Sequence, residues 1–137
     1  MTHLLRVFEE RQVFVKSPAA PKDVEPFVQQ TIEGWQLSHL TEPLWRTVRE
    51  LVAWVVANGP SGEFSVAVMW DEPVVHIEIS DRGASAPDAH VSLADAELAV
   101  RLLQPPAIEW GAELDSRGRC LWVAFATAKV DESLVSS

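Results

Sequence analysis

Two stretches of alternating apolar residues, each interrupted by a short polar turn, most constrain what this chain can fold into. Residues 64–70 and 75–79 alternate on either side of Asp71-Glu72-Pro73, and residues 108–114 and 121–125 do so around Ser116-Arg117-Gly118. Alternation with a period of two is typical of a strand with one buried face, and a short turn between two such runs indicates a β-hairpin. The sequence therefore predicts two antiparallel hairpins.

Two segments ahead of the first hairpin have apolar residues at helical spacing. The first covers residues 23–37. The second has Thr41 as a predicted N-cap and Pro43 in its first turn, where proline is tolerated, and residues 58–60 (Asn-Gly-Pro) end it. The spacing predicts two amphipathic helices that each bury one face.

The remaining segments complete the predicted order of elements. A strand ending near Lys16 comes first, residues 80–90 form a polar loop, and a third helix covers residues 93–103. The resulting order is β-α-α-β-β-α-β-β. It predicts an α+β fold of two layers, with a mixed, mostly antiparallel sheet and the helices on one face.

Length and charge limit the classes of function. The chain has 137 residues and a formal net charge of -9, which predicts one domain over residues 1–128 with a flexible tail at 129–137. The acidic balance argues against nucleic-acid and anionic-membrane partners and suits a basic protein partner. Cys120 is the one cysteine and the four histidines are scattered, so no metal site is expected. The charged N-terminus and the lack of a long apolar run predict a cytoplasmic protein.

Four segments carry a resemblance to a known family. They are residues 24–40 (VEPFVQQTIEGWQLSHL), 49–59 (RELVAWVVANG), 75–83 (VHIEISDRG) and 110–123 (WGAELDSRGRCLWV). In this order they resemble the first helix, the N-box helix, the adenine-binding strand and the closing hairpin of the histidine-kinase-like (GHKL/Bergerat) ATPase fold. The match covers most of the chain, and the segments resemble those of the actinobacterial regulators related to anti-sigma-factor serine kinases.

The N-box of that family implies a Glu and an Asn four residues apart on one helix face, where the Glu orients the attacking group and the Asn binds Mg²⁺. Glu50 keeps the first position, but Trp54 stands at the second. An indole cannot ligate Mg²⁺ because it offers no oxygen. We interpret Glu50 as a relic or an ordinary surface carboxylate, and Trp54 as a side chain that covers the sheet or fills the vacated pocket.

The resemblance also assigns adenine contacts. Asp81 and Gly83 match the motif that accepts the exocyclic amino group, although an Asp and a Gly also make ordinary turns. The phosphate-binding glycines are missing, and Glu97 and Ala99 stand in their places. Cys120 replaces a Thr that supports the adenine contact, and we expect a buried core thiol there.

These departures predict a non-catalytic regulatory protein with no cofactor. The resemblance implies that its partner is a sigma factor or an anti-anti-sigma-like regulator, and that the chain can form a homodimer. The alternative is an ATP-binding serine/threonine kinase, which would use ATP and Mg²⁺. A third possibility is an apolar small molecule in the remodelled pocket, with Trp54 as a wall. Aromatic residues favour interface centres, so among the six tryptophans Trp45 and Trp70 are the candidates for protein docking.

Overall fold

The computed structural model describes residues 8–57, 62–81, 106–115 and 118–128. Within them it has five strands, two α-helices and a short 3₁₀ turn. In chain order these are β1 (Phe8–Val15), α1 (Ala20–Gly34), η1 (Ser38–Leu40), α2 (Thr41–Ala57), β2 (Glu63–Asp71), β3 (Val74–Asp81), β4 (Ala107–Asp115) and β5 (Gly118–Ala126). Both predicted hairpins, the first strand and the first two helices are confirmed. The predicted helix over 93–103 and most of the loop over 80–90 lie outside the described residues.

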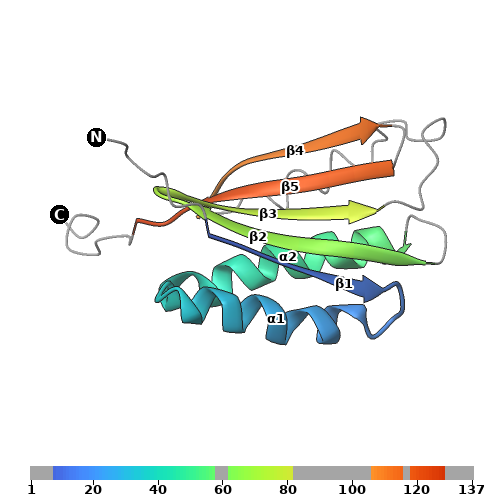
Figure 1. Cartoon of the computed structure of the whole chain (residues 1–137), viewed down its shortest axis with the longest axis horizontal. Helices are drawn as coiled ribbons and strands as arrows, with labels where there is room; N and C mark the ends of the chain where they lie inside the picture. The colour runs from blue at the N-terminus through green and yellow to red at the C-terminus, as the bar shows by residue number, and fades with distance from the viewer. Residues whose placement is uncertain (1–7, 58–61, 82–105, 116–117, 129–137) are drawn as a thin grey trace.

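The strands form one sheet in the order β1-β2-β3-β5-β4, and every described pair is antiparallel. Helices α1 and α2 lie side by side on one face of it, as Figure 1 shows. This confirms the predicted α+β sandwich of two layers. The two hairpins join through β3 and β5, so β1 and β4 are the edges of the described sheet.

The core fills the space between the helices and the face of the sheet that they cover, here called the inner face. Along β2 and β3 every second residue points to that face, and the two helices bury the residues of one stripe each. The largest fully buried side chains are Phe64, Phe125, Ile32, Leu40, Leu44, Leu51, Ile77, Ile79, Val24, Val28 and Val48. The alternating apolar residues of the strands and the apolar residues at helical spacing in residues 20–57 therefore pack together in one core.

Three helix boundaries differ from the prediction. Helix α1 begins at Ala20 instead of residue 23, and its end and the start of α2 differ for local reasons. Helix α1 ends at Gly34 instead of residue 37, because Gln36 adopts a left-handed conformation with φ 62°. The N–H of Leu37 donates to the carbonyl of Ile32 at 3.0 Å and that of Gln36 to Glu33 at 2.9 Å, the two bonds of a Schellman ending. A glutamine thus takes the position that glycine usually holds.

The N-cap prediction for Thr41 is wrong. Thr41 has helical dihedral angles, φ −54° and ψ −53°, and is the first residue of α2. Its Oγ1 is buried without a hydrogen-bond partner in the described part of the chain, whereas an N-cap side chain accepts a bond from the following turn. The 3₁₀ turn over Ser38–Leu40 leads directly into the helix.

Candidate functional site

The candidate site lies at the end of the sheet where the carboxyl ends of β1 and β3 meet. Asp81 is the last residue of β3 and shares the inner face with Ile77 and Ile79. Lys16 directly follows β1, and its N–H donates to the carbonyl of Gly62 at 2.8 Å. Strand β2 lies between β1 and β3 in the sheet, and the Nζ of Lys16 reaches Oδ1 of Asp81 at 2.6 Å. Two residues 65 positions apart thus form an ion pair beneath the sheet.

This ion pair is shielded from water. The side chains of Lys16 and Asp81 are 3% and 1% exposed. A buried carboxylate or ammonium loses several kcal/mol of hydration and is tolerated only with a close partner of opposite charge. Each charge therefore stabilises the other, and the pair ties the end of β1 to the end of β3.

Lys16 was absent from the predicted site residues, although the sequence contains a signal for it. Phe14 is buried, and Lys16 stands two residues later on the same face of an extended chain. A lysine on the inner face at the end of a strand needs an acidic partner. Which carboxylate it meets depends on the order of strands in the sheet.

The N-box positions lie on α2 at the side of its buried stripe. Glu50 and Trp54 are one helical turn apart and both are half-buried. Trp54 packs against the hydrophobic core, a position compatible with both interpretations, as a side chain that covers the sheet or fills the vacated pocket. Because an indole supplies no oxygen ligand, this face of α2 pairs one carboxylate with an aromatic ring.

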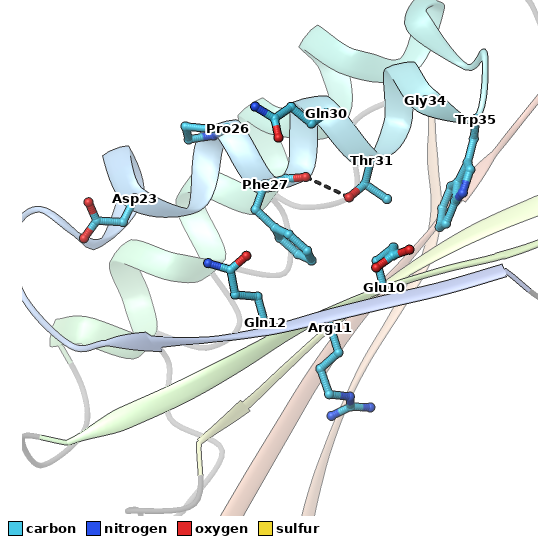
Figure 2. Close-up of a pocket in the computed structure, with 10 residues that line it drawn as sticks. All are labelled: Glu10, Arg11, Gln12, Asp23, Pro26, Phe27, Gln30, Thr31, Gly34 and Trp35. Carbon is cyan, nitrogen blue, oxygen red and sulfur yellow. Dashed lines mark hydrogen bonds between the residues drawn. The ribbon is translucent and has the colours of Figure 1, made fainter.

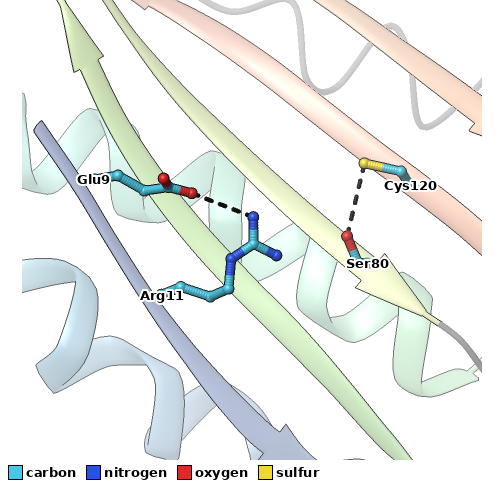
Figure 3. A network of polar contacts seen from close by, with 4 residues as sticks. All are labelled: Glu9, Arg11, Ser80 and Cys120. Atoms are coloured by element: carbon cyan, nitrogen blue, oxygen red, sulfur yellow. Dashed lines mark hydrogen bonds and ion pairs between the residues drawn. The ribbon is translucent and has the colours of Figure 1, made fainter. Parts of the chain in front are cut away.

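The structure places Cys120 on the face opposite Asp81. In β5, Leu121, Val123 and Phe125 point to the inner face, so Cys120 points to the other face, here called the outer face. There the hydroxyl of Ser80 donates to Sγ of Cys120 at 3.8 Å (Figure 3). The thiol is half-buried and is not a core residue. Neither the expected core thiol nor the adenine-supporting role fits this position, because the strand alternation turns the side chain away from Asp81.

The two tryptophans chosen as docking candidates belong to the interior. Trp45 is 8% exposed and is part of the core, so the docking interpretation of Trp45 does not hold. Trp70 is partly buried on the inner face, where it stacks on Phe8 at 5.6 Å and lies 5.9 Å from Trp35 between ring centroids. These contacts account for Trp70 as a packing residue. Gly83 and Glu97 lie outside the described residues.

A separate groove runs between α1 and the edge strand β1 (Figure 2). It has a volume of about 600 Å³. Polar residues from both elements line it, with Glu10 and Gln12 on β1 and Asp23 and Gln30 on α1. The sequence did not predict this groove, because its two walls belong to different elements. No local sequence pattern indicates how far apart α1 and β1 lie.

Within the described ranges no three potential metal-binding residues gather in one place. Among the same residues, no helix has the length and apolar character needed to cross a membrane. No protein-family model matches the sequence, and no curated protein matches it significantly.

Proposed function

We propose that this chain is a non-catalytic, cytoplasmic regulatory domain that binds a protein partner and resembles an anti-sigma factor with a degenerate nucleotide site. The resemblance points to a sigma factor or an anti-anti-sigma-like regulator as that partner, and to a chain that can form a homodimer. No ATP or Mg²⁺ takes part in this function.

The buried pair of Lys16 and Asp81 carries the proposal. An adenine ring at this site would donate its exocyclic amino group to the Asp81 carboxylate. Oδ1 already accepts a hydrogen bond from the Lys16 ammonium, and the 1% exposure of the Asp81 side chain leaves no open surface for a purine. Displacing Lys16 would break a buried ion pair, which costs about 3–5 kcal/mol. The ion pair therefore supports a site at Asp81 that holds no adenine.

The N-box supports the same conclusion independently. The position that the resemblance assigns to the Mg²⁺-binding Asn is Trp54, whose ring packs against the core. Charge-assisted contacts to phosphate are worth about 1.5–3 kcal/mol each. Without the Asn side chain to which the resemblance assigns Mg²⁺ binding, a triphosphate would lose that stabilisation.

The net charge favours a basic partner surface. The formal charge of -9 over 137 residues speeds encounter with positively charged proteins and discourages acidic ones. Binding of this kind needs no phosphoryl transfer and sequesters the partner by contact alone.

An ATP-binding serine/threonine kinase is the second candidate. Two positions favour it: Glu50 remains on α2 beside the inner face, and Asp81 remains at the end of an inner-face strand. A kinase would require Lys16 to leave Asp81 when nucleotide enters.

Calorimetric titration with ATP and ADP, each with and without Mg²⁺, tests the proposal. The expected result is no binding up to about 1 mM nucleotide, equivalent to a binding free energy weaker than about 4 kcal/mol. Micromolar, Mg²⁺-dependent binding would overturn it. In that case ATP-dependent phosphorylation of a partner protein that is lost in Glu50→Gln but kept in Glu42→Gln, the matched control on the same helix, would favour the kinase.

A further inference from the structure

The outward edge of β1 offers backbone hydrogen-bonding groups to a partner. The N–H of Lys16 points to β2, where it donates to Gly62. Because N–H and C=O groups alternate sides along an antiparallel strand, those of Glu9, Arg11, Val13 and Val15 point away from β2. In the described sheet no strand pairs with that edge of β1. An unpaired edge of this length is a template for one more strand.

The groove between α1 and β1 lies beside this edge, on the inner side of the sheet. Glu10 and Gln12 extend from β1 toward α1, whereas the Arg11 guanidinium points the opposite way (Figure 2). Residues of an added strand that stand opposite Glu10 and Gln12 would point into the groove, because directly paired residues share a face. The shape of the groove thus suits every second side chain of an extended segment.

The charges and surfaces of the groove select the chemistry of those side chains. Its acidic lining residues are Glu10 and Asp23. The one basic lining residue, Arg11, pairs with Glu9 at 3.3 Å on the outer face (Figure 3). Phe27 and Trp35 supply apolar walls, and long basic side chains can lay their aliphatic stems on such surfaces while the charged ends reach carboxylates.

The outer side of the same edge selects for apolar residues. Val13 and Val15 point to the outer face and are 56% and 62% exposed. An added strand would place its other set of side chains beside them, on the outer face. Apolar residues there would cover both valines.

We propose that the groove between α1 and β1 binds an extended segment of a partner protein, which adds to the free edge of β1 as a strand. The segment alternates basic residues, which enter the groove toward Glu10 and Asp23, with apolar residues, which cover Val13 and Val15. This inference rests on the proposed protein-binding function, since it names the surface and the chemistry of the partner. It follows the mode of strand addition, in which backbone bonds supply affinity and alternate side chains supply specificity.

Titration of nitrogen-15-labelled protein with a synthetic peptide tests the inference. The probe is a capped peptide of about nine residues in which Lys and Val alternate, long enough to cover a strand such as β1. The expected result is a Kd below about 1 mM, with the largest amide shifts at Glu9, Arg11 and Val13. A peptide of the same composition with its lysines and valines in separate blocks is expected to bind at least tenfold more weakly.

Three variants distinguish strand addition from general charge attraction. Val13→Pro removes an N–H at the free edge and leaves the bonds to β2 intact, so it is expected to abolish binding. Val13→Thr keeps that N–H and a branched side chain, so it is the matched control and is expected to bind like the wild type. Replacing both groove carboxylates (Glu10→Gln with Asp23→Asn) is expected to weaken binding about tenfold, since each exposed pair is worth about threefold.

Several results would overturn the inference. These are equal binding of the two peptides, equal binding by Val13→Pro and Val13→Thr, or shifts confined to residues away from β1 and α1. A wild-type dimer in sedimentation that becomes monomeric in Val13→Pro would also overturn it, because a second copy of the chain would then occupy the edge. The nucleotide titration is independent of the groove, so failure here leaves that test standing, and nucleotide binding there would not alter the result here.

Discussion

Removing the ammonium of Lys16 is the sharpest test of the buried ion pair. Lys16→Met keeps most of the aliphatic stem and removes the ammonium that pairs with the Asp81 carboxylate, whose side chain is 1% exposed. At 2.6 Å between Nζ and Oδ1, the gross attraction is about 6 kcal/mol at an effective dielectric constant of about 20. Desolvation of the two groups offsets part of it.

The expected loss of stability follows from the burial. Truncating one partner of a buried pair costs about 3–5 kcal/mol, because the other charge stays buried and loses the attraction of its partner. A loss of that size is a large fraction of the 5–15 kcal/mol that stabilises a typical domain. We therefore expect Lys16→Met to fold with a much lower denaturation midpoint.

Arg11→Met is the matched control. Like Lys16, Arg11 pairs with a carboxylate, here Glu9 of the same strand. The distance is 3.3 Å, and the side chains of Arg11 and Glu9 are 46% and 47% exposed. Exposed pairs of this kind contribute about 0.2–1 kcal/mol. The two variants remove one positive charge each from the same strand region and differ mainly in burial.

Urea denaturation followed by circular dichroism measures both free energies of unfolding, with an unchanged slope as the sign of two-state behaviour. The double variant Lys16→Met with Asp81→Leu is expected to be more stable than Lys16→Met alone, because no charge is left buried. Losses within about 1 kcal/mol of each other for Lys16→Met and Arg11→Met would refute the reasoning. A double variant less stable than Lys16→Met would refute it as well.

Two further predictions concern packing. A Cβ at Gly111 would lie 2.5 Å from two ring carbons of Trp122. Gly111→Ala is therefore expected to lower the free energy of unfolding by about 1–3 kcal/mol and to shift the tryptophan fluorescence. A thermal midpoint equal to that of the wild type would contradict this contact. Phe125 is fully buried and Ile108 is exposed. In urea denaturation, Phe125→Ala is expected to lower the free energy of unfolding by about 3–5 kcal/mol, and Ile108→Ala by less than about 0.5 kcal/mol. Similar losses of stability for the two variants would refute the assigned core.

Sequence reasoning predicted the described elements of the fold because their signals are local. The alternation in residues 64–79 and 108–125 reports which side chains face water, and the turn residues between them report a reversal of the chain. The same alternation indicates that Cys120 points to the outer face, since Leu121 and Val123 in the same strand point inward. The assignment of Cys120 to the adenine contact came from the resemblance. The alternation of the strand contradicts that assignment.

The candidate site was predicted only in part. Asp81 was selected from the sequence, and the structure places it at the end of an inner-face strand. Its partner Lys16 was not selected, because the bond joins residues 65 positions apart. Likewise, the ending of α1 at Gly34 required Gln36 to adopt a left-handed conformation, which residue type alone does not indicate.

The sequence by itself determined the period of each element and the face that each strand buries, since these depend on solvent contact and on the geometry of a few consecutive residues. Only the tertiary structure decided that β1 pairs with β2, that Lys16 therefore reaches across to β3, and that α1 lies against β1 to form the groove. The physical reason is that the order of strands depends on how whole elements pack together, and a buried charge finds its partner only once that order is set.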